Sequence, residues 1–346
     1  MKLLKITTII CMMFFLAGCG KKEGQKENPS SSSYRKVPTT TIVGKIENPG
    51  DYLIEFVVKD STIIVDLNED NTFTFTTDQL DQPGEIDFIH HQKAGALYVI
   101  PGTQLTFNTD YNLLFLNAEF EGPTADNNRY LFKKYMIQQS SDNPQVLYSS
   151  GEKEFLSKID QLKNDKLQLL YSYKVVFGDS AYFKTEQGNI LYEWANRLMS
   201  YGNMHAMMLN IPVYETGDSL KNLLKAIPLE RPQLLNSYRY VNFVFDQITQ
   251  KANESMASAT VAADQVDKVM LDASVEQTNK LITNEQIKKR LISEFVNSYY
   301  LSMNEADRYE ALQQYQQYLT TENIEKLKKT AKEYDADQSE DQTEIL

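Results

Sequence analysis

Hydrophobic and polar residues alternate between Thr40 and Phe120, which is the pattern of short β-strands. Phe73 and Phe75, for example, alternate with threonines, so one face of that segment is expected to be buried and the other hydrated. Turn-forming Asn, Asp, Pro and Gly separate the segments. The expected strands are 41–46, 52–58, 62–67, 72–76, 86–90, 97–100, 104–109 and 113–120. They predict an antiparallel β-sandwich or small barrel.

Beyond Gly122-Pro123 the apolar residues recur every three or four positions, which predicts helices. The expected helices are 127–139, 152–176, 181–208, 218–226, 233–250, 285–303, 305–319 and 321–334. One apolar face is formed by Leu234, Tyr238, Val241, Phe245 and Ile248, and another by Ile292, Phe295, Val296, Tyr299, Tyr300 and Met303. Residues 251–283 have no clear pattern. The predicted fold class is therefore α+β, with an N-terminal β-sandwich or barrel followed by an α-helical array.

The first residues have the three parts of a bacterial lipoprotein signal. Lys2 and Lys5 supply positive charge, about ten apolar residues follow, and the stretch ends in Leu16-Ala17-Gly18-Cys19. This ending resembles the lipobox, in which Leu16, Ala17 and Gly18 are recognised by the signal peptidase and the cysteine carries the lipid. The apolar stretch is shorter than the roughly 20 residues that span a bilayer. An ordinary secretory signal that happens to contain a cysteine is the alternative.

These patterns predict five segments. They are a signal peptide at 1–18, a flexible tether at 19–37, the β-domain at 38–121, the helical domain at 122–334 and an acidic disordered tail at 335–346. We expect Cys19 to hold the mature protein to the cell envelope through lipid. Gly20, by its resemblance to sorted lipoproteins, favours the outer membrane over the inner one. The sequence leaves open whether the protein faces the periplasm or the cell exterior.

Charge and cysteine content restrict the possible functions. The formal net charge is −12, and removal of residues 1–18 leaves 33 basic against 47 acidic side chains, about −14. Such a surface repels nucleic acid, so no nucleic-acid partner is expected. The two cysteines are Cys11, which leaves with the signal, and Cys19, which is expected to be acylated. Chemistry that needs a thiolate is therefore not expected, and no cofactor is predicted.

Several segments of the strand region follow one another in an order that resembles a known family. They are Thr41-Ile42-Val43-Gly44-Lys45-Ile46-Glu47-Asn48, Asn71-Thr72-Phe73-Thr74-Phe75, 97–107, Phe120-Glu121-Gly122, Asn127, Asn128 and Tyr130. The family consists of envelope lipoproteins in which this β-domain and a helical stretch precede a thioredoxin-like domain. The resemblance covers residues 38–135 and the helical remainder more loosely. Because this sequence has no Cys-x-x-Cys, the family's redox activity is not carried over.

Two sequence patterns resemble metal-binding sites, but no metal site is predicted from either of them. Asp66-x-Asn68-x-Asp70 matches the first half of a calcium loop, but the sixth and twelfth positions lack the required Gly and Glu, so a hairpin turn is predicted. His90 and His91 are adjacent, so a strand would point them to opposite faces, and His205 is expected in the core or at its rim. No metal is predicted.

Aromatic and serine residues suggest two kinds of surface site. Tyr171, Tyr173, Tyr182, Tyr192 and Trp194 could stack on sugar rings, although packing between helices explains them equally well. Short Asp-Ser patterns mark candidate O-glycosylation sites at Ser61, Ser180 and Ser219.

The leading hypothesis is a non-enzymatic, membrane-anchored envelope lipoprotein that binds a protein partner or acts as a scaffold. The alternative is a glycan- or nutrient-binding lipoprotein of the outer membrane, which predicts an exposed aromatic groove. A third hypothesis, a hydrolase that uses two carboxylates, predicts two acids facing each other at about 5 to 9.5 Å across a cleft.

Overall fold

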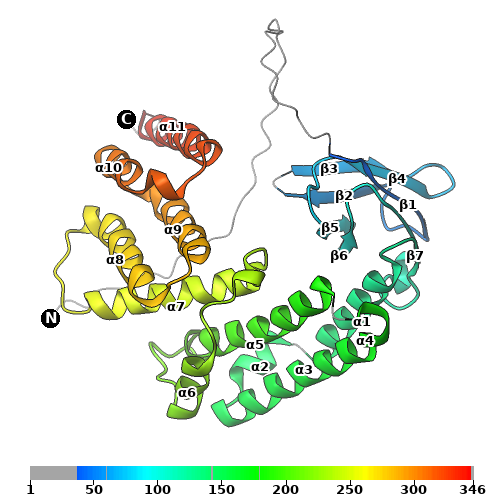
Figure 1. Cartoon of the computed structure of the whole chain (residues 1–346), viewed down its shortest axis with the longest axis horizontal. Coiled ribbons are helices and arrows are strands. Elements are labelled where there is room, and N and C mark those ends of the chain that lie inside the picture. The colour runs from blue at the N-terminus through cyan, green and yellow to red at the C-terminus, as the bar shows by residue number, and fades with distance from the viewer. Residues whose placement is uncertain (1–36, 60, 142, 179, 344–346) are drawn as a thin grey trace, which may run out of the picture.

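The computed structural model of the protein describes residues 37–59, 61–141, 143–178 and 180–343. Within these residues, two four-stranded β-sheets face each other and are followed by a long array of α-helices (Figure 1). The α+β class and the order of its two parts are thus confirmed. The expected signal peptide, lipobox, Cys19 and nearly all of the tether lie outside the described residues.

The two sheets contain eight strands. These are β1 (Thr40–Glu47), β2 (Leu53–Val58), β3 (Ser61–Asp66), β4 (Thr72–Thr77), β5 (Gly84–His90), β6 (Lys93–Val99), β7 (Gln104–Asp110) and β8 (Glu119–Glu121). One sheet has the order β4-β1-β7-β8 and the other β3-β2-β5-β6. Neighbouring strands are antiparallel except β1 and β7, which are parallel and pair Gly44 with Phe107. The β-domain is therefore an open sandwich with one parallel pair.

Two local expectations for the β-domain are wrong. The segment 113–120 is not one strand, because Tyr111–Leu113 forms a 3-10 turn and only Glu119–Glu121 pairs with β7. The turn after Asp66 is not a hairpin, because β3 and β4 belong to different sheets. In that turn Asn71 has φ 65°, and the Asp70 carboxylate accepts hydrogen bonds from the backbone N and Oγ1 of Thr72 at 3.1 and 2.6 Å. Asn and Asp residues of this kind often form the turn of a hairpin. In this protein they instead form the turn that leads the chain from one sheet to the other.

The sandwich core combines aliphatic side chains with aromatic rings from both sheets. Phe73 and Phe75 are 2% and 1% exposed while the intervening Thr74 is exposed, so the predicted alternation is confirmed. One ring comes from outside the sheets: Phe132 of α1 (Ala125–Ser141) packs 4.9 Å from the ring centroid of Phe120 and 5.7 Å from that of Phe107. The first helix therefore closes one side of the β-domain and belongs to its core.

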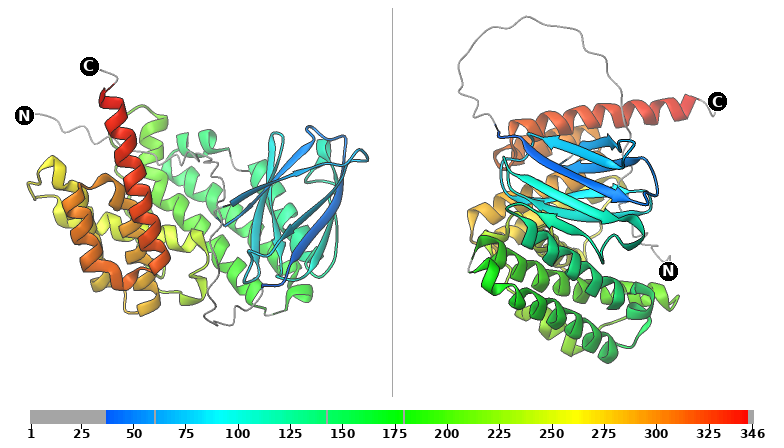
Figure 2. Two further views of the ribbon diagram at one scale, coloured as in Figure 1. Left: turned by 90° about the horizontal axis from the view of Figure 1, so that it is seen from above. Right: turned by 90° about the vertical axis from the view of Figure 1, so that its right-hand side faces the viewer.

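The remaining helices form an array that leads away from the sandwich. They are α2 (Pro144–Ser149), α3 (Glu152–Ser172), α4 (Lys174–Phe177), α5 (Ala181–Met208), α6 (Asp218–Ala226), α7 (Tyr238–Met256), α8 (Val266–Leu281), α9 (Glu285–Tyr299), α10 (Glu305–Tyr315) and α11 (Thr321–Thr343). The long helices pack in chain order, α1 on α3, α3 on α5, α5 on α7, α7 on α8 and α8 on α9. Figure 2 shows the sandwich at one end of this array and α8 to α11 at the other. None of the described helices combines the length and apolarity needed to cross a bilayer.

Most of the expected helices are present in the structure, with a few differences. The bounds of α5 and α6 coincide with the expected ranges, whereas α2 and α8 were not expected. Tyr238 does not lie on the buried face predicted for it, because it is 62% exposed. Ser237 caps α7, its Oγ accepting from the backbone N of Tyr240, so the helix begins at Tyr238 and not at residue 233. Helix α11 continues to Thr343, into the part of the chain for which a disordered tail is expected.

Candidate functional site

A groove of about 850 Å³ lies between α5, α6 and α7. Its floor is apolar: Leu198 and Leu220 line it and are 0% and 1% exposed as members of the helical core. Tyr214, from the segment between α5 and α6, is a further lining residue. Its rim carries hydroxyl, amide and charged side chains, namely Ser200, Asn203, Thr216, Lys221, Lys225, Asp246, Gln247, Thr249, Gln250, Lys251, Asn253 and Glu254. An apolar floor with a polar rim is typical of a binding site.

Three charges on this rim lack a partner among the described residues. Lys221 and Lys225 project one helical turn apart from α6, and Asp246 lies on α7. The ion pairs within the described chain involve none of these three side chains. Asp246 is exposed, but the protein around the groove removes part of the hydration of its carboxylate and raises the pKa of this group. These groups are available to a charged or hydrogen-bonding ligand.

The second acid of the groove, Glu254, is already engaged. Its carboxylate accepts from Lys251 Nζ at 2.5 Å and from Gln250 Nε2 at 3.1 Å. Glu254 and Asp246 lie eight residues apart on the same helix, which corresponds to an axial separation of roughly 12 Å. The two groove acids therefore do not form the facing pair that the hydrolase hypothesis requires.

An apolar segment, residues 207–213, adjoins the groove; it comprises the end of α5 and the residues that follow, and we call it the apolar loop. Four side chains within seven residues are substantially exposed: Met207 at 54%, Leu209 at 48%, Ile211 at 39% and Val213 at 74%. The next residue, Tyr214, lines the groove itself. Four exposed apolar side chains in one short segment make this segment a candidate contact surface for another molecule.

A second polar cluster is buried where the helices meet the sandwich. The Lys134 ammonium on α1 lies 2.5 Å from Glu186 Oε1 on α5, and the Lys134 and Glu186 side chains are 9% and 1% exposed. Tyr130 OH donates to Glu186 Oε1 at 3.0 Å, and Asn189 Nδ2 donates to Glu186 Oε2 at 3.0 Å. Burial, the largest single effect, raises the pKa of Glu186, but Lys134, Asn189 and Arg239 together outweigh burial and keep the pKa below its usual value.

The cluster continues along α5 to Glu193. Its Oε1 accepts from Lys166 Nζ at 2.5 Å and from Arg197 at 3.0 Å, while Arg239 Nε lies 3.9 Å from its Oε2. Burial raises the pKa of Glu193, but these cations more than compensate and hold the pKa at about 2. Burial lowers the pKa of Lys166, which is 1% exposed, despite the adjacent carboxylate. The cluster therefore joins α1, α3, α5 and α7 through charges withdrawn from water.

Helix α1 also holds the edge of the second sheet directly. Asn128 Oδ1 accepts from the backbone N of Tyr98 at 2.8 Å, and Asn128 Nδ2 donates to the Tyr98 carbonyl at 2.9 Å. These two bonds imitate a neighbouring strand for β6. Asn236, just before α7, donates from Nδ2 to Gln82 Oε1 at 3.2 Å and adds a contact on the β4–β5 connection.

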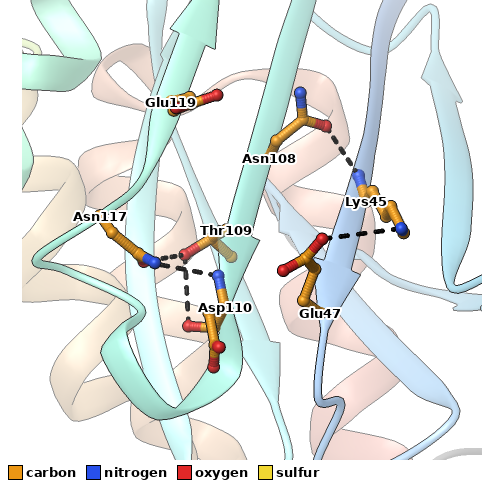
Figure 3. Close-up of a pocket in the computed structure, with 7 residues that line it drawn as sticks. All are labelled: Lys45, Glu47, Asn108, Thr109, Asp110, Asn117 and Glu119. Carbon is orange, nitrogen blue, oxygen red and sulfur yellow. Dashed lines mark hydrogen bonds and ion pairs between the residues drawn. The ribbon is translucent and has the colours of Figure 1, made fainter.

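A smaller hollow lies on the outer face of the first sheet (Figure 3). It has a volume of about 340 Å³ and is lined by residues of β1, β7 and the segment around β8. Many of its polar groups already bind one another: Asn108 Oδ1 accepts from the Lys45 backbone N at 3.0 Å, and Asn117 Oδ1 accepts from the Asp110 backbone N at 3.4 Å. Lys45 lies 3.7 Å from Glu47. These contacts stabilise the strand ends.

The aromatic residues proposed as a sugar surface are not gathered on one face. Tyr192 is fully buried and Trp194 is 8% exposed, both within the helical core. Tyr173 and Tyr182 pack against Phe177 with ring centroids 5.4 and 5.1 Å apart. Tyr171 alone of the five is largely exposed, at 51%. These five rings therefore do not line an exposed aromatic groove.

The three candidate glycosylation serines are all exposed. Ser61 lies on β3 and Ser219 on α6, whereas the Ser180 hydroxyl caps α5 by accepting from the Phe183 backbone N at 3.2 Å. Their modification stays a prediction.

The histidines occupy two separate places. His90 is fully buried with Nδ1 2.8 Å from the Leu53 carbonyl oxygen, and His205 is 5% exposed with Nδ1 2.7 Å from the Tyr148 carbonyl oxygen, as expected for a core position. His90 and His91 do not face opposite ways, because His91 leaves the strand with φ 53° and both rings contact Tyr111. Within the described residues, no three His, Cys, Asp or Glu side chains gather as metal ligands would.

Searches against protein-family models, curated proteins and solved structures find no match to this chain.

Proposed function

We propose that this protein is a non-enzymatic, lipid-anchored lipoprotein of the bacterial envelope that binds a protein partner through the groove between α5, α6 and α7. The single observation that carries the proposal is the combination of the 850 Å³ groove with the exposed apolar loop 207–213 beside it. Protein interfaces commonly combine an apolar centre with a polar rim. The lipobox ending in Cys19 supports the envelope location, and Gly20 favours the outer membrane.

The chemistry of the groove also supports a binding role. Lys221, Lys225 and Asp246, which have no ion-pair partner among the described residues, can form ion pairs or hydrogen bonds with another protein, and the floor offers apolar contact. The buried charges around Glu186 and Glu193 already form ion pairs with neighbouring lysines, and these pairs hold the helices together. Neither of these two arrangements provides a nucleophile activated by an adjacent base.

Photo-crosslinking in the native envelope tests the proposal. The full-length chain carries benzoylphenylalanine in place of Lys225 on the groove rim, and a matched variant carries it in place of Lys329, which is 78% exposed on α11. We expect a discrete protein adduct from the groove position that is absent from the α11 position. Identical adduct patterns from both positions, or no adduct from either, would contradict the proposal.

A glycan or nutrient ligand is the second candidate. The observation in its favour is the number of amide and hydroxyl groups on the groove rim, including Asn203, Gln247 and Asn253, together with Tyr214. The apolar loop 207–213 argues for a protein partner instead, because sugars do not need such a surface. Sugar analysis of protein purified from the native envelope, without a protein adduct at Lys225, would favour this second candidate.

A further inference from the structure

Strand β3 forms one edge of the sheet β3-β2-β5-β6, and among the described residues it pairs with β2 alone. It lies on the side of the sandwich turned away from α1 (Figure 1). In the antiparallel pair with β2, the Leu67 backbone N donates to the Tyr52 carbonyl at 2.8 Å. Because backbone groups alternate in direction along a strand, the N–H and C=O groups of Thr62, Ile64 and Asp66 point away from β2. They form an open row of hydrogen-bonding groups.

The sequence of β3 lacks the features that usually protect an edge strand. Natural edges are commonly very short, covered by another element, or interrupted by proline or charge. Strand β8 is three residues long and α1 covers the edge of β6, whereas β3 has six residues and carries its one charge at the last position. Ile64 is 61% exposed, and Ile63 and Val65 on the inner face are only partly buried. A neighbouring strand would bury all three further.

Strand β3 is complementary to itself in one antiparallel register. When two copies meet across a two-fold axis at Ile64, the free backbone groups of Ile64 face those of the same residue in the second copy. Thr62 then lies opposite Asp66, so its hydroxyl can donate to the carboxylate, and Ile63 lies opposite Val65. Within β3 this register places no two like charges opposite each other.

The charges beyond the ends of β3 favour the same orientation. Lys59, whose side chain is 56% exposed, precedes the strand, and Glu69 follows it in the acidic turn 66–70. In the antiparallel register the Lys59 end of one copy comes beside the Glu69 end of the other. A parallel pairing would place Lys59 beside Lys59 and is disfavoured by repulsion.

We propose that two copies of this protein associate through β3, which joins their β3-β2-β5-β6 sheets into one continuous sheet with Ile64 at the two-fold axis. The edge is separate from the groove between α5, α6 and α7, so the inference is independent of the proposed function.

Cysteine crosslinking in membranes of the native host tests the register. The reagent is dibromobimane, which joins thiols on directly opposite positions of neighbouring strands. Ile64→Cys alone is expected to give a crosslinked dimer. Thr62→Cys and Asp66→Cys are each expected to give none alone, because identical positions lie roughly 14 Å apart in this register. Coexpression of these two variants with different tags is expected to give a dimer that contains both tags.

Two controls define the background of this experiment. Glu119→Cys lies on β8, an edge strand at the opposite side of the sandwich, and should give no dimer. The unsubstituted chain measures any reaction at Cys11 or Cys19. A crosslink from Ile64→Cys to a different protein, no crosslink from it, or an equally abundant dimer from Glu119→Cys would contradict the proposal.

Sedimentation of the full-length chain in neutral detergent measures the strength of association. A single strand pair is at the small end of specific interfaces, so we expect a Kd of about 1–50 μM. Ile64→Lys places two ammonium groups beside each other at the axis and should raise the Kd tenfold or more. Leu116→Lys, whose leucine is 68% exposed just before β8, should leave the Kd unchanged.

Circular dichroism of both lysine variants verifies that the monomer keeps its fold, which is expected because Ile64 and Leu116 are exposed. Wild-type protein that stays monomeric at about 200 μM would overturn the proposal. A folded Ile64→Lys protein that dimerises as strongly as wild type would also overturn it.

Discussion

At the scale of single residues, Lys134 on α1 and Glu186 on α5 form a buried ion pair between the helix that closes the sandwich and the longer array. Both charged side chains are almost completely buried. The Glu186 carboxylate also accepts hydrogen bonds from the Tyr130 hydroxyl and the Asn189 side-chain amide. Breaking such a pair by removing one partner leaves an uncompensated charge, whereas replacing both with apolar residues is much better tolerated. The pair therefore specifies how α1 sits on α5.

We predict that Lys134→Met lowers the free energy of unfolding by about 3–5 kcal/mol, measured by urea denaturation of the full-length protein. The double variant Lys134→Met/Glu186→Leu should lose less than Lys134→Met alone, because no lone charge stays buried. Lys329→Met, whose lysine is 78% exposed, is the control and should change stability by less than about 0.5 kcal/mol. A double variant that is less stable than the single variant would refute this account of the pair.

The Glu193 carboxylate predicts a specific loss of stability in acid. Its pKa is about 2 in the folded protein and has an ordinary value of 4.5, so the folded state binds fewer protons between these values. The stabilisation is complete above pH 4.5 and disappears as the pH falls toward 2. At about 1.4 kcal/mol per pH unit, it amounts to about 3 kcal/mol. The difference in unfolding free energy between wild type and Glu193→Gln should shrink from about pH 7 to about pH 2.5, and a difference independent of pH would contradict the prediction.

At the scale of elements, the parallel pairing of β1 with β7 depends on a glycine. A Cβ atom at Gly44 would lie 1.8 Å from the carbonyl oxygen of Phe107, which is backbone and cannot rotate away. A Cβ atom at Gly84 on β5 would meet no other atom within 4 Å, so this glycine serves as a matched control. The pairing therefore requires close approach of two backbones at one position, a demand that only glycine meets.

We predict that Gly44→Ala destabilises the protein by about 3 kcal/mol or more, or prevents soluble expression, whereas Gly84→Ala changes stability by less than about 1 kcal/mol. Thermal unfolding followed by circular dichroism compares the two variants. Equal melting temperatures for both would show that β1 does not approach β7 as closely as described.

Element boundaries were predicted best where capping and periodicity agree. Ser180 caps α5 and the apolar spacing continues to Met208, so its bounds follow from local residues. Helix α8 escaped prediction because its buried face includes Lys268, Ser274 and Thr278, which conceal the apolar period. In a similar way, the strand expected at 113–120 was wrong because Leu114 and Phe115 pack under a turn instead of continuing a ladder.

At the scale of the whole molecule, the sandwich is attached to the helical array by polar side chains as well as by packing. Asn128 occupies the edge of β6, Phe132 enters the sandwich core, and the Glu186 cluster links the next helices. An arrangement held at three different places resists hinge motion between its parts. The groove between α5, α6 and α7 is thus held in a fixed position relative to the β-domain.

The expected anchor gives a prediction for the whole protein in its host. Cys19→Ala should abolish labelling by radioactive palmitate and release the protein from the membrane pellet, because acyl chains supply the membrane affinity. Cys11→Ala, within the expected signal peptide, is the control and should keep both properties. A Cys19→Ala protein that remains in the pellet after a high-salt wash would refute the lipid anchor.

The sequence by itself determined the two-part α+β organisation, the inward faces of strands such as β4 and the course of helices such as α5, because periodicity, turns and caps act over a few residues. The tertiary structure decided which strands pair, and it decided the sites. Lys134 and Glu186 are 52 residues apart, and the groove draws on three helices that are separated along the chain. The local sequence around a charged residue in a helix is the same whether that residue contacts water or a distant side chain. Only the packing of the helices therefore reveals which partner a charged residue has.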